Sequence, residues 1–354
     1  MKKMGAAVSK CERGRTLDRR ACCLFNERRI AQRKGWLVNN SFHLDFERPI
    51  IELEKKIEEL SQQAANDGLD LQQDIARLQS RVEEQRQKIY NNLSSWQKVQ
   101  ISRHPERPYA LDYVERMLSD FTELHGDRYY ADDPSVVAGP ARLDGESIMV
   151  VGIQSGRNLE ERQRRNFGMP HPEGYRKALR LMKMADKFGL PILTMVDTSG
   201  AYPGVEAEER GQAEAIARNL YEMSHLRVPI VVAITGQAFS GGAIGITVGD
   251  RILMMEHSCY SVIVPESCST ILFKVRERKE EAAEALKLTA TDLKEQGIID
   301  RIVTEPFGGA HRNWDESAAN LKRHILEALA ALSPLDAAEL VRQRIDKFTA
   351  MARF

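Results

Sequence analysis

The sequence predicts an α/β fold with a mostly parallel sheet, preceded by a pair of helices. Short apolar runs without polar alternation recur along the chain, as expected of strands that are buried on both faces. Longer segments with apolar residues three or four positions apart separate these runs, and this is the spacing of helices that cover a sheet. Hydrophobic residues make up 42% of the chain and charged residues 29%, which is ordinary for a globular protein.

The composition excludes several classes of protein. The 51 Lys and Arg residues balance the 51 Asp and Glu residues, so we expect no nucleic-acid or membrane partner. No apolar run reaches the ~20 residues that cross a bilayer, and we therefore expect a soluble, cytoplasmic protein. Five cysteines without a Cys-x-x-Cys pair fit neither a disulfide framework nor a structural zinc site.

Residues 1–41 form a basic leader. Within residues 1–40, eleven Lys and Arg side chains stand against three Asp and Glu, a net charge of +8. Two functional interpretations are a transit peptide and a nucleic-acid-binding arm. We favour a disordered tail, or upstream sequence read as protein because the start codon is placed too early, since organised periodicity begins only at Phe42.

Residues 42–104 are predicted to form a helical hairpin. Apolar residues at helical spacing indicate one helix from Pro49 and a second from Leu71, with a break over residues 64–68. Each helix has a single apolar face, which must lie on the body of this chain or on a partner.

Residues 105–313 form the predicted α/β body, and residues 314–354 the closing helices. Prolines within 104–108 end the hairpin. We expect buried strands at 147–153, 191–196, 229–234 and 251–255, and helices at 175–188, 206–224 and 243–248. The two closing helices are separated at Ser333-Pro334.

Small residues follow two of the predicted strands. Segment 197–204 reads Asp-Thr-Ser-Gly-Ala-Tyr-Pro-Gly, and segment 235–245 contains four glycines. Ligands of open α/β sheets bind at the carboxyl ends of strands, where small residues allow a close approach and helix amides favour negative charge. Glycines that merely permit tight turns are the alternative. Two such segments at successive strand ends favour a site for a developing oxyanion, such as a thioester enolate.

Several familiar motifs are absent. The glycine-rich segments contain no Gly-Lys-Ser/Thr of a P-loop and no G-x-G-x-x-G of a dinucleotide site, and the histidines have no metal-site spacing. One rival interpretation is a ClpP-like or signal-peptide-peptidase-like serine peptidase, with Ser240 as nucleophile and Lys274 as base. Another is a non-catalytic partner that docks through its hairpin and basic leader.

A basic cluster brackets residues 166–172 and continues into the first predicted helix of the body. It consists of Arg157, Arg162, Arg164, Arg165, Arg176, Lys177 and Arg180. Such a cluster suits a phosphate-rich ligand such as coenzyme A, or an acidic partner. Ordinary solvated helix charges are the alternative for any one of these side chains.

Several motifs together resemble the carboxyltransferase alpha subunit of bacterial-type acetyl-CoA carboxylase. They occupy residues 164–170, 172–182, 200–204, 207–212 and 308–312, and the start of the hairpin at 44–47 also matches. The resemblance runs from about Phe42 to the closing helices.

The resemblance implies a crotonase-like (ClpP/crotonase) fold of repeated ββα units. It also implies transfer of a carboxyl group from carboxybiotin, carried on a separate biotin carboxyl carrier protein, to acetyl-CoA, which gives malonyl-CoA for fatty-acid synthesis. Biotin carboxylase would spend the ATP, and a beta subunit in an alpha2beta2 assembly would carry zinc. We expect no metal in this chain, and no activity without the beta subunit.

In such an enzyme, backbone amides can stabilise the enolate-like oxygens. We expect the amides of Gly241, Gly242 and Ala243 to form an oxyanion hole that faces biotin, while the beta subunit supplies a second one and most contacts to coenzyme A. The expected substrate-binding residues are Gly200, Ala201, Tyr202, Pro203, Gly204, Phe239, Arg164, Arg165 and Lys274.

The chain departs from the family pattern at five positions near the expected site, two of which are Gln237 in place of a glutamate and Ala238 in place of a glycine. Ser199 stands in place of a proline, Phe239 in place of a glycine, and Ser267 in place of a glycine. Phe239 is the most consequential, because a bulky ring beside the pocket wall would alter the response to substrate or inhibitor. A divergent paralogue that acts on another acyl-CoA is therefore the alternative function.

Overall fold

The computed structural model describes residues 42–67 and 71–351. Contacts divide the chain into two units, Met1–Phe42 and His43–Phe354. The predicted basic leader, residues 1–41, lies outside the described residues.

A seven-stranded sheet forms the centre of the second unit. Its strands are β1 (Val136–Leu143), β2 (Glu146–Ile153), β3 (Ile192–Thr198), β4 (Ile230–Phe239), β5 (Arg251–Met255), β6 (Cys259–Ser261) and β7 (Arg301–Val303). The order is β1-β2-β3-β4-β5-β7, and β6 pairs with the end of β4. Only the β1–β2 pair is antiparallel, and the other described pairs are parallel. Every residue of β3 is buried, as its continuous apolar run predicts.

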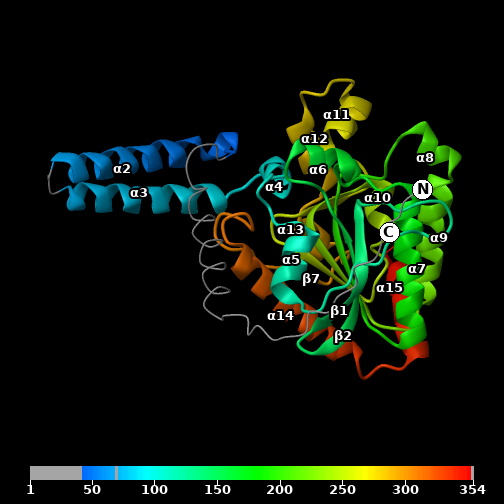
Figure 1. The fold of residues 1–354 in the computed structure, drawn as a ribbon. Helices are drawn as coiled ribbons and strands as arrows, with labels where there is room; N and C mark the ends of the chain where they lie inside the picture. Colours follow the sequence, from blue (N-terminus) through cyan, green and yellow to red (C-terminus); the bar gives the residue numbers. More distant parts are fainter. Residues whose placement is uncertain (1–41, 68–70, 352–354) are drawn as a thin grey trace, which may run out of the picture. The chain divides into compact units, whose positions relative to one another are not determined.

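Helices cover both faces of the sheet (Figure 1). One face packs against α7 (Pro172–Phe188), α9 (Gln212–His225) and α15 (Ala337–Ala350), and the other against α5 (Ala110–Met117) and α14 (Trp314–Leu332). The predicted break between the closing helices is confirmed, because α14 ends just before Ser333-Pro334. The remaining helices of the body are α4 (Ser95–Ser102), α6 (Leu159–Arg164), η2 (Asn166–Gly168), α8 (Val205–Glu209), α10 (Ser240–Ile244), α11 (Pro265–Phe273), α12 (Lys279–Leu286) and α13 (Ala290–Glu295).

The predicted hairpin is present. A short turn, η1 (Asp45–Glu47), leads into α2 (Arg48–Asp67), which packs against α3 (Gln72–Tyr90). The helix α2 runs through residues 64–67, so the expected break begins later than the sequence indicated.

A buried carboxylate fixes the base of this hairpin. Glu47 accepts hydrogen bonds from the Tyr90 hydroxyl at 2.6 Å and from Arg312 Nη2 at 2.8 Å. Burial alone would raise the pKa of Glu47, but these two partners and the Leu44 amide hold it below its usual value. Two segments that carry the family resemblance, 44–47 and 308–312, therefore meet in space.

Three predicted elements of the body have different bounds in the structure. The strand β4 continues five residues beyond 234, because β6 supplies hydrogen-bond partners for residues 237–239. The helix expected over 206–224 is broken at Gly211, whose φ of 82° is left-handed. The next helix begins at Ser240, earlier than expected, and ends at Ile244.

The closing helix α15 is tied to the sheet through one buried arginine. Arg344 donates hydrogen bonds to the carbonyl oxygens of Met223, Leu226 and Val228. Its Nε and Nη2 also donate to the two carboxylate oxygens of Asp250, at 2.9 Å and 2.8 Å. Its side chain thus closes the connection that leads from α9 into β4.

Candidate active site

The two glycine-rich segments meet at the carboxyl ends of β3 and β4. A Cβ atom on Gly242 would lie 2.2 Å from the carbonyl carbon of Gly200 and 2.4 Å from the Ala201 nitrogen. Only a residue without a side chain allows this approach. The Tyr175 hydroxyl donates a hydrogen bond to the Gly242 carbonyl at 3.1 Å and holds the turn from below.

The amides predicted to bind an oxyanion lie in the first turn of α10. This helix has no side-chain cap at its start, and the first amides of a helix have no acceptor within it. Ser240 is exposed and adopts a left-handed φ of 61°, which turns the chain sharply out of β4. The nearest atom to a Cβ on Gly241 would be Ile216 Cδ1 at 3.4 Å, so this side of the turn has open space.

Residues 200–204 pack against the motif at 164–170. The ring of Tyr202 stacks on His171 with 4.0 Å between centroids, and its amide donates to the Pro170 carbonyl at 3.0 Å. Gln212 Nε2 donates to the carbonyls of both Pro170 and Tyr202. The structure therefore gathers these motifs into one edge of the sheet.

A polar pocket of about 260 Å³ borders this edge. Arg164, His171 and Arg210 are among its lining residues, together with Asp133 and Glu173. Arg164 is exposed, and its guanidinium makes no hydrogen bond or ion pair with the described residues. It is therefore available to an anionic ligand.

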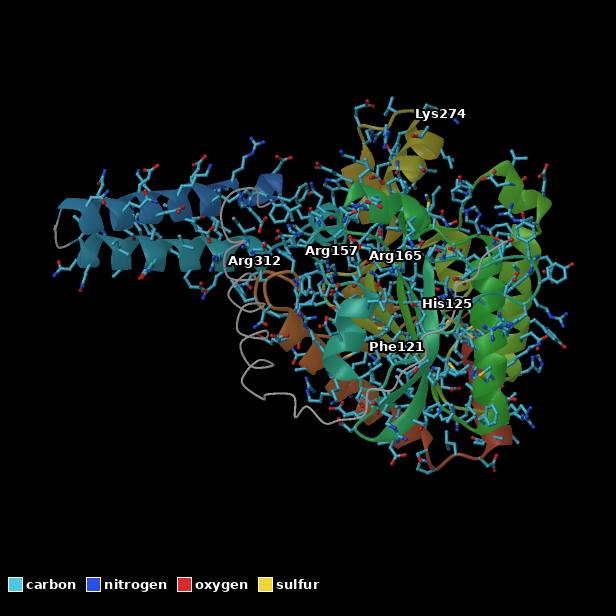
Figure 2. All side chains as sticks on the ribbon, viewed as in Figure 1. Phe121, His125, Arg157, Arg165, Lys274 and Arg312 are labelled. Atoms are coloured by element: carbon cyan, nitrogen blue, oxygen red, sulfur yellow. The ribbon has the colours of Figure 1, made fainter. Side chains whose placement is uncertain are left out.

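The other members of the basic cluster are engaged within the described part of the chain. Arg165 donates to the Pro134 carbonyl at 2.7 Å, and burial lowers its pKa. Lys177 is fully buried against Asp132. Arg157 lies over the rings of Tyr109 and Trp314, and its position is labelled in Figure 2. Carbonyl oxygens, carboxylates and rings of the fold therefore already contact these side chains, and a shared phosphate-binding cluster stays a prediction.

Two further predicted residues lie elsewhere than expected. The ring of Phe239 does not line a pocket wall, because it is fully buried with Trp96, Val99 and Cys259 beneath α4. Lys274 is exposed at the end of α11, where it is labelled in Figure 2, and its side chain makes no hydrogen bond or ion pair with the described residues. The structure does not bring it to the glycine-rich turns.

Sequence reasoning missed a buried charged group beneath the turns. Arg107 Nη1 donates to Glu305 at 2.8 Å, and both side chains are fully buried. Burial alone would raise the pKa of Glu305, but Arg107 holds it at about 2. The carboxyl group of Asp197 lies at the end of β3, and burial raises its pKa to about 7. Of these three residues, only Asp197 could have been identified from the sequence, because it is a polar residue directly after an apolar run.

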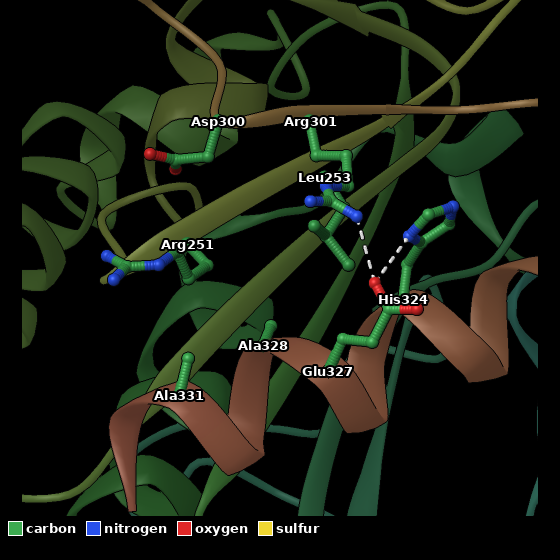
Figure 3. Close-up of a pocket in the computed structure, with 8 residues that line it drawn as sticks. All are labelled: Arg251, Leu253, Asp300, Arg301, His324, Glu327, Ala328 and Ala331. Carbon is green, nitrogen blue, oxygen red and sulfur yellow. Dashed lines mark hydrogen bonds and ion pairs between the residues drawn. The ribbon is translucent and has the colours of Figure 1, made fainter.

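Two other cavities lie at the opposite edge of the sheet. One, of about 280 Å³, is lined by β5, β7 and α14, and there Arg301 and His324 both bond to Glu327 (Figure 3). The other, of about 620 Å³, opens where β2, β3 and β4 begin. Neither touches the glycine-rich turns.

Two searches of the described residues found nothing. Within 42–67 and 71–351, no group of three or more His, Cys, Asp or Glu side chains is arranged to hold a metal ion. Among the helices of the same residues, none is both long enough and apolar enough to cross a membrane.

Comparison with known proteins gives a consistent result. Residues 43–352 match the family described as acetyl co-enzyme A carboxylase carboxyltransferase-like. An acetyl-coenzyme A carboxylase carboxyl transferase subunit alpha from Chlorobium phaeovibrioides is 56% identical over 87% of this chain and 96% of its own length. The subunit of the same name from Geobacter metallireducens is 54% identical over 89% of this chain and 99% of its own length.

Solved structures share the fold at low sequence identity. A transcarboxylase 12S structure matches 64% of this chain with a TM-score of 0.52 and 20% identity, and this chain covers 42% of that one. A Pseudomonas malonate decarboxylase hetero-tetramer matches 62% of this chain with a TM-score of 0.51 and 16% identity, over 88% of its own chain. The fold is the crotonase-like fold that the resemblance implied. Together with the family match over 43–352, these findings show that the chain belongs to the acetyl-coenzyme A carboxylase carboxyltransferase alpha subunits.

Proposed function

We propose that this chain, in complex with a carboxyltransferase beta subunit, transfers a carboxyl group from carboxybiotin on a separate carrier protein to acetyl-CoA. The product is malonyl-CoA. The observation that carries the proposal is the contact between Gly242 and the Gly200–Ala201 peptide. It packs two glycine-rich turns together in a chain that matches the family along 43–352.

The residues of the turn fit a biotin-linked carboxyl donor. Carboxybiotin supplies an activated carboxyl group and, after its release, a base for the methyl proton of acetyl-CoA. The amides of Gly241, Gly242 and Ala243 would hold the negative charge that develops on an oxygen, since no ionisable side chain is needed for this task.

Partners complete the proposed site. The beta subunit supplies the second oxyanion hole, the zinc-binding cysteines and most contacts to coenzyme A, while Arg164 offers an exposed cation to an anionic group. A separate biotin carboxylase loads the carrier at the expense of ATP. This chain alone would then be inactive, because half of the reacting groups lie in the partner.

The peptidase alternative has less support. Ser240 is exposed in a strained turn, as a nucleophile would be, but Lys274 caps the end of α11 instead of bonding to it.

Co-expression with a carboxyltransferase beta subunit tests the proposal. The purified complex, given acetyl-CoA and carboxylated carrier protein, should form malonyl-CoA, and either subunit alone should not. A pure complex that forms no malonyl-CoA, or turns over a longer acyl-CoA in its place, contradicts it.

A further inference from the structure

The pairing of β3 with β4 is interrupted next to the glycine-rich turns. The two strands pair in register up to Val196 opposite Ile234, and they resume with Thr198 opposite Ala238. A single residue of β3, Asp197, therefore stands opposite three residues of β4. Such bulges bend a strand and redirect the residues that follow.

The carboxyl group of Asp197 fills this bulge. Its Oδ1 accepts a hydrogen bond from the Gln237 amide at 3.1 Å. A Cβ atom on Gly236 would lie 2.5 Å from the carboxyl carbon, so the backbone of β4 wraps closely around the group. Asp197 is 7% exposed, and the contact is shielded from water.

Arg107 holds the same bulge through a hydrogen bond to a backbone carbonyl oxygen of β4. Its Nε donates to the Thr235 carbonyl at 2.7 Å, and its Nη2 donates to the Ser258 hydroxyl at 3.2 Å. The ion pair with Glu305 fixes the guanidinium from behind. Two side chains thus fix the bulge: Arg107 donates to the carbonyl of Thr235, and Asp197 accepts from the amide of Gln237.

At this bulge β4 exchanges one neighbour for another. Before it, Ile234 pairs with Met254 of β5, and after it, Gln237 pairs with Cys259 of β6. The direction of the strand beyond the bulge determines where Ser240 begins the turn into α10. A change in the bulge would therefore be carried to the amides that follow within a few residues.

We propose that Asp197 and Arg107 are positioning residues for carboxyl transfer, which hold the β4 bulge and thereby aim the amides of Gly241–Ala243. This inference rests on the proposed function and deepens it. Neither side chain needs to touch a substrate. Both act through the backbone of residues 235–237.

The grip on the bulge depends on pH. The titratable and charged groups that face Asp197 are Arg107, Tyr109 and Tyr113, the last with a buried hydroxyl that has no partner among the described residues. Burial raises the pKa of Asp197 to about 7, although Arg107 and the Gln237 amide pull it down. The ionised carboxylate is the stronger acceptor and attracts Arg107, so the grip weakens as the pH falls through 7.

The complex with the beta subunit gives the first test, through Asp197→Asn and Gly236→Ala. Asparagine keeps the shape but not the charge, and an added Cβ at Gly236 displaces an intact carboxyl group. Both variants should lower kcat at pH 8 by about tenfold or more, with the KM for acetyl-CoA within about twofold. Asp197→Asn should also lose the rise in kcat between pH 6 and 8. Thr194→Val is the matched control, because the Thr194 hydroxyl is buried in β3 without a partner.

Hydrogen exchange of the isolated full-length chain gives the second test. The amides of 237–239, which pair with Asp197 and β6, should exchange faster in Asp197→Asn than in wild type or Thr194→Val at pH 8. If the wild-type complex forms no malonyl-CoA, the proposed function fails. Hydrogen exchange alone then shows whether Asp197 holds the β4 bulge. If the wild type is active and Asp197→Asn matches it in kcat and pH profile, the inference is overturned, whatever the exchange shows. Unchanged exchange in 237–239 overturns it as well.

Discussion

The α-carbon of Gly242 lies so close to the Gly200–Ala201 peptide that no side chain fits between them. Gly242→Ala should therefore separate the two turns and reduce malonyl-CoA formation by about a hundredfold or more, because small displacements of reacting groups are that costly. Steady-state assay of the complex measures the loss. Gly241→Ala, whose Cβ would meet only Ile216 Cδ1 at 3.4 Å, is the control for denaturant unfolding alone, because its amide belongs to the proposed oxyanion hole. A Gly242→Ala variant with normal activity would contradict the packing of these turns.

Ser240→Ala separates carboxyl transfer from serine-dependent hydrolysis. The variant should keep malonyl-CoA formation within about threefold of wild type, because the amides of the following residues remain in place. A serine peptidase would lose all activity. Assay of both variants with acyl-CoA and with peptide substrates decides between the two, and complete loss of carboxyl transfer would favour a direct role of the hydroxyl.

Asp197→Asn should stabilise the chain at alkaline pH while it lowers activity. The folded-state pKa of about 7 lies above the ordinary value of 3.8, so the folded chain binds this proton more tightly than the unfolded chain. The stabilising contribution is complete below pH 3.8, declines as the pH rises and is lost above about 7. Asparagine avoids the loss, and we expect a gain of roughly 2–4 kcal/mol at pH 8 that vanishes near pH 4. Urea unfolding between pH 4 and 8 measures it, and a constant difference would contradict the shifted pKa.

Phe239→Gly should act on stability before it acts on specificity. The ring is fully buried among Trp96, Val99 and Cys259, so its removal leaves a cavity and costs about 3–5 kcal/mol or more. Denaturant unfolding measures the cost. Phe239→Leu, which keeps most of the volume, should restore much of the stability and leave the kinetics unchanged. A changed acyl-CoA preference in a stable Phe239→Leu variant would return the residue to the pocket wall.

Arg164→Ala should weaken binding without destabilising the fold. Its side chain is exposed and bonds to none of the described residues, so unfolding should be unchanged, whereas the KM for acetyl-CoA should rise about fivefold to tenfold at constant kcat. Arg157→Ala is the matched control, because Arg157 is held by Asp112 and by the rings of Tyr109 and Trp314. That variant should lose about 1–2 kcal/mol of stability and keep its KM. A raised KM in Arg157→Ala together with an unchanged KM in Arg164→Ala would assign ligand binding to Arg157.

The strands and the meeting of the two glycine-rich turns could be predicted because their signals are local. Continuous apolar runs gave β3 and β5, and small residues directly after successive strands indicated one shared edge. The resemblance supplied the name of the fold, which these patterns alone do not contain.

The bulge could not be predicted, and the sequence therefore placed the end of β4 too early. Residues 235–239 include Gly236 and Gln237, which read as a loop, yet β6, a strand of three residues, pairs with them. Three residues opposite one shift the register by two, so Ala238 stays on the same face of the sheet as Ile234 and packs in the same core cluster. The continuation of β4 through Phe239 places this ring beside Trp96, Val99 and Cys259, contacts that are distant in sequence. The pairing of Arg107 with Glu305 joins residues 198 positions apart and leaves no periodic trace.

The buried contacts of Arg344 have a consequence for the order in which the chain folds. Three carbonyl oxygens and the Asp250 carboxylate depend on a guanidinium carried by the last described helix. During synthesis Arg344 leaves the ribosome after every strand of the sheet. Until then, the Asp250 carboxylate of the nascent chain has no arginine partner. The α9–β4 connection therefore closes only after all strands of the sheet have been synthesised, and chains truncated before residue 344 should be retained by chaperones or degraded.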